Sequence, residues 1–358
     1  MIPQMERDLQ HTYKSLSDAE RQKFSGGTIL LTGSAGFIGY YLTNFFRRFR
    51  ADFGLKKIIC LDNFMLGAPA WQTDFIADEH FAFEKFDVIR DDVVTIDGAA
   101  EANFVIHMAS IASPTFYRLH PLETIDANIW GLRRLLDFYR DKNLAGLLFF
   151  SSSEIYGDPP PEFVPTAEDY NGNVSATGPR ACYDESKRFG ETLCRVFAQV
   201  HNMPIGVVRP FNNYGAGMKL NDKRVPADFA KNVLEGKDIV ILSNGAPKRT
   251  FCHIADAAAG YLKILLHGRY DYFNIGMDKP EISIAELAEI YRAAGAELVN
   301  YRGQVRYAVS NDTDYLTNNP QRRCPVLDKA RRILNYNPTI FVEEGVRRFL
   351  TFLKEAHE

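Results

Sequence analysis

The feature that most constrains this chain is a glycine-spaced turn, Gly33-Ser-Ala-Gly36-Phe-Ile-Gly39, between an apolar run and a helical pattern. The apolar run covers residues 28–32, and apolar residues recur at helical spacing over residues 37–49. In such a turn the first glycine permits a tight bend, the second lets the backbone approach a phosphate, and the third lets helix and strand pack closely. The helix N-terminus then offers N–H groups to a diphosphate. The turn therefore predicts a dinucleotide site beside the first strand of an α/β sheet.

The same strand-then-helix order continues along the chain. Further apolar runs cover residues 57–61, 104–106, 147–150 and 205–208. Helical spacing covers residues 121–140 and 183–200, and shorter helical patterns cover 225–234, 254–266, 284–294 and 342–353. Strands that alternate with helices pair in parallel, with helices on both faces. The pattern predicts an α/β fold with a doubly wound parallel Rossmann sheet and a smaller, mixed C-terminal domain.

The chain divides into three stretches on this basis. Residues 1–26 form an N-terminal extension, in which residues 7–24 predict a short amphipathic helix that is an appendage to the fold. Residues 27–210 are expected to form the NAD-binding domain, completed by part of 250–275. Residues 211–358 are expected to be mainly substrate-binding.

Composition excludes several classes of protein. A net charge of -3 lacks the clustered basic residues that nucleic-acid binding requires. The five cysteines are scattered, without the paired spacing of a zinc site, so we expect no metal. No segment approaches the roughly 20 apolar residues of a membrane span. We expect a cytoplasmic protein that binds neither nucleic acid nor membrane.

Acidic residues after the second and third strands indicate which dinucleotide binds. Asp62, followed by Asn63, ends the second strand, where a carboxylate accepts hydrogen bonds from an adenosine ribose and repels a 2′-phosphate. This favours NAD over NADP, although Asp62-Asn63 is also good turn chemistry. Asp87 and Val88 follow the third strand, in a position to contact adenine.

A tyrosine and a lysine form the candidate catalytic pair. Tyr183 and Lys187 lie four residues apart and project from one face of a helix. An ammonium beside a phenol lowers the pKa of the phenol and makes it a general base. Ser152, at the end of a strand, would bridge the substrate oxygen and the phenol. The alternatives are a chance spacing on an amphipathic helix and a loop capped by hydroxyls at 151–153.

These motifs together resemble a known superfamily. The glycine turn, the Ser-Ser-Ser-Glu-Ile-Tyr-Gly run at 151–157 and the Tyr183/Lys187 pair resemble the extended short-chain dehydrogenases/reductases, over roughly residues 27–355. Within that superfamily, segments 112–117, 153–159 and 168–188 are similar to the UDP-glucuronate decarboxylases, also called UDP-xylose synthases.

The resemblance implies NAD-dependent decarboxylation of a UDP-hexuronic acid, UDP-glucuronate, to a UDP-pentose, UDP-xylose. Oxidation at C4 would place a ketone β to the C5 carboxylate, which then leaves as carbon dioxide. Tyr183 would act as the base, and Ser152 and Tyr183 would stabilise the enolate oxygen. Ser153 and Glu154 would position the carboxylate or a water, and Glu154 would deliver a proton to C5.

The resemblance also implies wider binding sites and a homodimer. Its cofactor residues are Gly33, Ala35, Gly36, Phe37, Ile38, Gly39, Asp62, Asn63, Asp87, Val88, Met108, Ala109, Ser110, Asn128, Ser151, Tyr183, Lys187 and Arg209. Its substrate residues are Ser113, Pro114, Tyr117, Glu154, Asn212, Lys219, Arg224, Arg249 and Arg322. A guanidinium such as that of Arg249 suits both phosphate and carboxylate, although each arginine could instead form a surface ion pair. The two long helices are expected to pair across a two-fold axis.

Other activities remain open at this point. A nucleotide-sugar 4-epimerase needs only Tyr183, Lys187, a hydroxyl and room for the keto sugar to rotate. A 4,6-dehydratase would place an Asp-Glu pair where this chain has Ser153-Glu154. A non-catalytic NAD(H)-binding protein should have lost Tyr183 or Lys187. Gly215-Ala-Gly-Met218 replaces the family's Gly-Pro-Arg-Met, which leaves the base and the sugar open.

Overall fold

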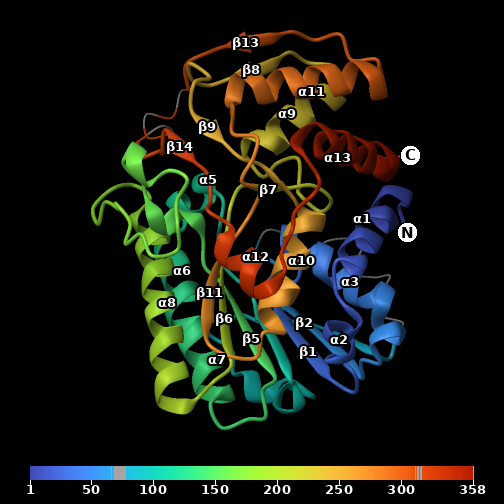
Figure 1. Cartoon of the computed structure of the whole chain (residues 1–358), viewed down its shortest axis with the longest axis vertical. Coiled ribbons are helices and arrows are strands. Elements are labelled where there is room, and N and C mark those ends of the chain that lie inside the picture. Colours follow the sequence, from blue (N-terminus) through green and yellow to red (C-terminus); the bar gives the residue numbers. More distant parts are fainter. Residues whose placement is uncertain (66, 68–77, 311, 313, 315–316, 358) are drawn as a thin grey trace.

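The computed structural model describes residues 1–65, 67, 78–310, 312, 314 and 317–357, and it is built around one parallel sheet (Figure 1). In the described residues this sheet has seven strands in the order β11-β6-β5-β4-β1-β2-β3, all of whose pairings are parallel. The strands are β1 (Thr28–Thr32), β2 (Lys57–Asp62), β3 (Phe81–Lys85), β4 (Phe104–His107), β5 (Gly146–Phe150), β6 (Ile205–Pro210) and β11 (Asp271–Ile275). The predicted doubly wound sheet is confirmed.

Helices cover both faces of the sheet because its central strands are apolar on both sides. Leu30 and Val105 face one hydrophobic cluster, whereas Ile29 and Ile106 face another. The first cluster is closed by α7 (Leu132–Tyr139) and α8 (Ala181–His201), and the second by α3 (Phe37–Phe53) and α10 (Ile254–Leu265). This is the pattern of strands buried in the middle of three layers.

The predicted helix over residues 121–140 is interrupted. It consists of α6 (Pro121–Asp126), a π-helical turn (Ala127–Gly131) and α7, preceded by α5 (Pro114–Leu119). Short 3-10 turns cover Val93–Thr95, Ala99–Glu101, Ser153–Tyr156 and Pro161–Phe163.

A smaller part lies above the carboxyl ends of the strands (Figure 1). Its helices are α9 (Val225–Leu234), α11 (Ile284–Val299) and α13 (Val342–His357), whereas α12 (Asp328–Leu334) packs beside the sheet against β11 and α10 (Figure 1). Its strands are β7 (Asn213–Tyr214), β8 (Ile239–Ile241), β9 (Lys248–Arg249), β10 (Cys252–His253), β12 (Ile282–Ser283), β13 (Val305–Tyr307) and β14 (Arg322–Arg323). They pair as β10-β7, β12-β9-β14 and β13-β8. None of the helices in the described part of the chain has the length and apolarity that a membrane crossing requires.

The expectation that the N-terminal stretch is an appendage is wrong. It forms two helices, α1 (Pro3–Lys14) and α2 (Asp18–Gln22), and α2 begins at a capping box on Ser17. Leu9 and Phe24 are fully buried in the larger hydrophobic cluster. The backbone N–H of Gln4 donates to Glu355 at 2.7 Å, and the two chain ends lie side by side in Figure 1. The stretch is part of the core.

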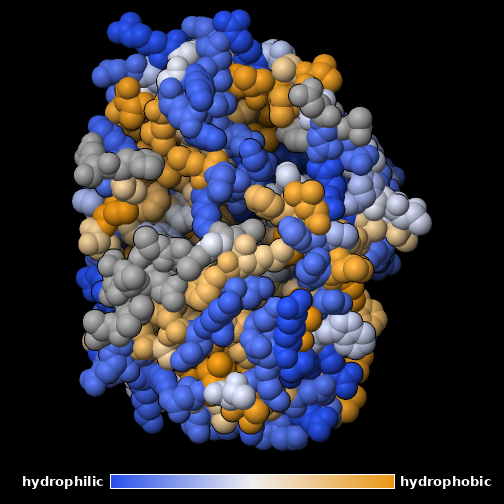
Figure 2. Space-filling model, turned by 180° about the vertical axis from the view of Figure 1, so that it is seen from behind, coloured by the Kyte–Doolittle hydropathy of each residue, from blue (hydrophilic) through white to orange (hydrophobic). Residues whose placement is uncertain are grey.

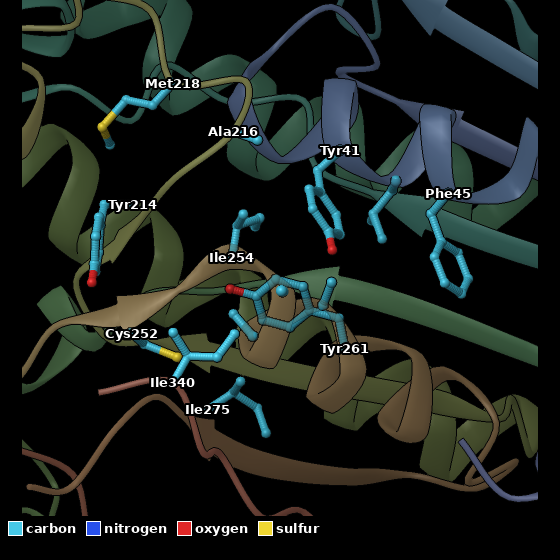
Figure 3. Packing of buried hydrophobic residues seen from close by; sticks show 14 of the residues in the cluster. Tyr41, Phe45, Tyr214, Ala216, Met218, Cys252, Ile254, Tyr261, Ile275 and Ile340 are labelled. Carbon is cyan, nitrogen blue, oxygen red and sulfur yellow. The ribbon is translucent and has the colours of Figure 1, made fainter. Parts of the chain in front are cut away.

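The same cluster joins the sheet to the smaller part. In Figure 3, Tyr41 and Phe45 of α3 lie on one side of Tyr261 of α10, and Cys252 and Ile340 lie on the other. These buried side chains fix how the smaller part sits over the sheet. Between β1 and β4, the order of the strands reverses, which is where open α/β sheets bind ligands.

Candidate active site

The glycine turn has the geometry that its spacing predicts. Gly33 has φ +75°, and a Cβ there would lie 2.8 Å from the backbone N of Ala109. A Cβ on Gly39 would lie 2.3 Å from the carbonyl oxygen of Gly33. Both positions therefore exclude any side chain, and the turn leads directly into the N-terminus of α3. Such a turn forms a cradle for a diphosphate.

Asp62 lies beside this turn at the end of β2. Its carboxylate accepts hydrogen bonds from the N–H of Ala35 at 3.0 Å and from that of Phe64 at 2.8 Å. Burial raises the pKa of Asp62, while these two hydrogen bonds lower it. The carboxylate is thus held against the glycine turn, where the ribose of a dinucleotide would lie.

A cavity of about 1150 Å³ runs from the glycine turn to the smaller part, and the surface is hollowed there in Figure 2. Sixteen of the eighteen predicted cofactor residues line it: Gly33, Ala35, Gly36, Phe37, Ile38, Gly39, Asp62, Asn63, Asp87, Val88, Met108, Ala109, Ser110, Ser151, Tyr183 and Lys187. The buried hydroxyl of Ser110 has no hydrogen-bond partner within the described residues. The glycine cradle and this unpaired hydroxyl fit a bound dinucleotide.

Tyr183 and Lys187 project from α8 into this cavity. Tyr183 makes a side-chain hydrogen bond with Ser152, and the ammonium of Lys187 lies 5.6 Å from the centre of the Tyr183 ring. Lys187 donates to the carbonyl oxygen of Phe150 at 2.7 Å. Base, bridging hydroxyl and lysine therefore lie at the carboxyl ends of β5 and β6.

The expectation that Lys187 lowers the pKa of Tyr183 is wrong for this structure. Burial raises the pKa of Tyr183 to about 12, and the groups that lower it are Ser152 and Arg224. Burial lowers the pKa of Lys187 to about 7. Lys187, whose ammonium lies 5.6 Å from the centre of the Tyr183 ring, is not among the main groups that shift the pKa of Tyr183.

Glu154 is held between two arginines. One carboxylate oxygen binds the guanidinium of Arg180 and the other binds that of Arg323. Although burial raises the pKa of Glu154, these guanidiniums hold it at about 2. Arg323 also donates to the Ser153 hydroxyl at 3.4 Å. Glu154 is consequently an ionised group in this state and not a proton donor at neutral pH.

Arg249 adds a third guanidinium beside Glu154. It donates to the carbonyl oxygens of Lys248 at 2.7 Å and Pro320 at 2.5 Å, and also to the side-chain amide oxygen of Asn319. Burial and the neighbouring Arg323 lower the pKa of Arg249 to about 9. Three cationic groups thus face a single strongly acidic carboxylate, and the site can accept a further anion.

The remaining predicted substrate residues fall into two groups. Those that line the cavity are Ser113, Pro114, Tyr117, Glu154, Asn212, Lys219, Arg224 and Arg249. Arg224 is paired with Asp222 through two of its nitrogens, and Ser113 donates to the carbonyl oxygen of Asp222 at 2.7 Å. Arg322 does not line the cavity, because its guanidinium binds the carboxylate of Glu281.

Neither Arg180 nor Arg323 is among the site residues predicted from the sequence. Arg323 directly follows Arg322 on β14, and successive side chains of a strand point to opposite faces. In the structure Arg323, and not the predicted Arg322, lines the cavity. Arg180 precedes Tyr183 by three residues, a helical spacing that would have placed both on one side.

Two predicted cofactor residues also lie outside the cavity. Asn128 is fully buried in the π-helical turn and donates to the Ser186 hydroxyl at 2.9 Å. Arg209 pairs with Glu191 through two nitrogens and donates to the Tyr156 hydroxyl at 2.7 Å. The guanidinium of Arg209 is satisfied by protein groups, whereas the amide oxygen of Asn128 is buried without a hydrogen-bond partner among the described residues.

Residues 29–276 match the NAD dependent epimerase/dehydratase family. The chain belongs to this family. Among its relatives, UDP-glucuronic acid decarboxylase 1 of Xenopus tropicalis is 31% identical over 100% of this chain and 79% of that protein. UDP-glucuronic acid decarboxylase 3 of Arabidopsis thaliana is 31% identical over 89% of this chain and 86% of that protein.

Solved structures in this epimerase/dehydratase family share the fold. The UDP-glucuronic acid 4-epimerase of Bacillus cereus, in complex with UDP-glucuronic acid and NAD, has a TM-score of 0.76 and 23% identity. The match covers 92% of this chain and 99% of that one. At this identity the likeness concerns the fold alone, and the chemistry must be argued from the site.

Proposed function

We propose that this protein is an NAD-dependent decarboxylase that converts UDP-glucuronate to UDP-xylose through a 4-keto sugar. The observation that carries the proposal is the excess of positive charge around Glu154. Arg180, Arg249 and Arg323 surround one ionised carboxylate, next to the catalytic Tyr183. Such a site favours a sugar that carries its own carboxylate over a neutral hexose. The similarity to UDP-glucuronic acid decarboxylases along the chain supports the same substrate.

The cofactor side of the cavity suits NAD. The glycine turn would hold the diphosphate, Asp62 the adenosine ribose and Lys187 the nicotinamide ribose. When bound, NAD would accept a hydride from C4 of the sugar and later return it. We further propose that residues 27–210, with part of 250–275, hold NAD and that residues 211–358 mainly hold the UDP-sugar.

The chain's own residues supply the proton transfers. Tyr183 would take the proton of the 4-hydroxyl, and the Ser152 hydroxyl would bridge sugar oxygen and phenol. Once C4 is a ketone, the C5 carboxylate is β to it and leaves as carbon dioxide, because the electron pair moves onto the C4 oxygen. The enolate would then take a proton from water at C5, which restores the C4 ketone for the return of the hydride. Tyr183 and Ser152 would donate hydrogen bonds to that oxygen.

The surface formed by α6, the π-helical turn that follows it and α8 supports a homodimer. Large apolar side chains are exposed there, at Leu122, Trp130, Phe189, Val196 and Val200. We propose that these helices pair across a two-fold axis. Trp130→Glu should give a monomer in analytical ultracentrifugation, while Val309→Glu, at an exposed site elsewhere, should remain dimeric. We place this dimer in the cytoplasm, which suits five cysteines that form no disulfide.

A product analysis tests the proposed activity. Purified protein is incubated with UDP-glucuronate and a catalytic amount of NAD+, and nucleotide sugars are followed by mass spectrometry. We expect a UDP-pentose, carbon dioxide and no net NADH, with no turnover by Tyr183→Phe and no change in UDP-glucose. A product of unchanged mass would instead identify a 4-epimerase.

A further inference from the structure

The cluster around Glu154 contains a second carboxyl group, which the proposed chemistry does not use. Asp184 follows Tyr183 on α8 and is 5% exposed. It does not line the cavity. Its neighbour one turn earlier is Arg180, whose Nε lies 3.7 Å from Asp184 Oδ2. The same guanidinium binds Glu154 through Nη2. Arg180 is therefore shared by two carboxyl groups, one facing the cavity and one behind it.

In this structure Arg180 contacts Glu154 more closely than it contacts Asp184. Arg180 Nε and Asp184 Oδ1 are both buried and have no hydrogen-bond partner in the part of the chain that is described. A distance of 3.7 Å exceeds that of a hydrogen bond between charged groups. Arg180 Nε thus lies near Asp184 Oδ2 without a short hydrogen bond to it, while the same guanidinium is engaged with Glu154 through Nη2. A small shift of Arg180 would close the second contact and weaken the first.

The charges around Asp184 determine how tightly its carboxyl group binds a proton. Burial and the ionised Glu154 raise the pKa of Asp184 to about 7, although Arg180 and Arg323 act to lower it. Beyond these groups, the phenol of Tyr117 on α5 lies near both carboxylates, and both raise its pKa. Near neutrality a proton therefore resides on Asp184 for part of the time, while Glu154 remains ionised.

We propose that Asp184 is a positioning residue for Glu154 and acts through the Arg180 guanidinium that the two share. When Asp184 is protonated, Arg180 remains on Glu154 and keeps it strongly acidic. When Asp184 is ionised, it draws Arg180 Nε towards itself and weakens the contact of Arg180 with Glu154, which then keeps Arg323 as its main partner near the reacting sugar. The catalytic part of this inference rests on the proposed function, whereas the coupling between the two carboxyl groups does not.

The coupling is tested first, without substrate, by infrared titration of the full-length protein. We expect the C=O band of a protonated carboxyl to titrate near neutral pH in the wild type and to be absent in Asp184→Asn. In Glu154→Gln the midpoint of that band should fall by about one pH unit or more, because the negative neighbour is gone and Arg180 is released. An unchanged midpoint in Glu154→Gln, or a band that survives Asp184→Asn, would overturn the proposal.

The consequence for catalysis is tested by the pH dependence of carbon dioxide release. In the wild type kcat should rise between about pH 6 and 8 as Asp184 ionises. Asp184→Asn mimics the protonated form, so its kcat should stay at the wild-type low-pH level, with KM changed by less than about twofold. Asp184→Glu should restore the rise. A variant profile like that of the wild type, or an equal loss at all pH values that Asp184→Glu does not restore, would contradict the proposal.

These two tests separate failure of the inference from failure of the proposed function. If UDP-glucuronate were not decarboxylated, the infrared titration would still decide whether Asp184 and Glu154 share Arg180. If Asp184→Asn did not fold, Glu154→Gln alone would report the shift of the midpoint.

Discussion

Tyr117 lies parallel to Tyr183, with ring centres 5.0 Å apart and ring planes inclined by 9°. Tyr117 comes from α5 and is almost fully buried, and its hydroxyl has no hydrogen-bond partner among the described residues. Its ring, not its hydroxyl, therefore fixes the plane of the Tyr183 ring. An offset stack of this kind restricts the rotation of the neighbouring ring.

Removal of this stack should slow catalysis. We expect Tyr117→Leu to lower kcat about tenfold or more, because Tyr183 loses the surface that orients it. Tyr117→Phe keeps the ring and serves as the matched control, with kcat within about threefold of the wild type. Steady-state kinetics of both variants decide the question. Equal impairment of the two would assign the effect to the hydroxyl.

Arg322 and Arg323 offer a second matched pair, since they are neighbours on β14 with different partners. Arg323→Gln should lower kcat/KM for UDP-glucuronate about 100-fold, because it removes a guanidinium from the cluster around Glu154. Arg322→Gln loses only a half-exposed pair with Glu281 and should stay within about threefold. If Arg322→Gln were the more damaged variant, our account of the site would be wrong.

In the ligand-free protein, Lys187 should lower the free energy of unfolding. Burial lowers its pKa from the ordinary value of 10.5 to about 7 in the folded state, so the unfolded chain binds the proton more tightly. Stability therefore rises with pH between about 7 and 10.5. Lys187→Met should increase the free energy of unfolding at pH 7 by on the order of 2 kcal/mol while abolishing activity. Urea unfolding of the wild type and of Lys187→Met at pH 7 and pH 10 checks this. The same difference in free energy of unfolding between the two proteins at both pH values would contradict it.

The N-terminal helix should contribute to global stability. Leu9 is fully buried, so Leu9→Ala should cost about 2 to 5 kcal/mol. Lys14 is exposed on the same helix, and Lys14→Ala should change the free energy of unfolding by less than about 0.5 kcal/mol. Chemical denaturation measures both. A loss below about 1 kcal/mol for Leu9→Ala would mean that the stretch is an appendage after all.

The sequence predicts the central sheet well because its strands are fully apolar and bounded by clear turns. The predicted runs at 28–32 and 147–150 coincide with β1 and with nearly all of β5. The N-terminal stretch is different, because its apolar residues are few and their burial depends on α10 and α13, far along the chain. The π-helical turn at Ala127–Gly131 leaves no signal in a pattern of helical spacing.

The candidate site was only partly predictable for a similar reason. Motif spacing placed Tyr183, Lys187 and Asp62 because local structure fixes them. It could not place Arg180 or Arg323, because these arginines and Glu154 belong to three separate elements that come together only in the fold. The sequence could not predict the pKa of Tyr183 either, since that pKa depends on burial more than on the neighbouring lysine.

The most direct test of the account is decarboxylation in D2O. The protein, NAD+ and UDP-glucuronate are incubated in D2O, and the nucleotide sugar is analysed by mass spectrometry and NMR. We expect a UDP-pentose that carries one solvent deuterium at C5, because that carbon must take a proton after carbon dioxide leaves. A nucleotide sugar that retains its carboxylate and carries no deuterium at C5 would contradict the account.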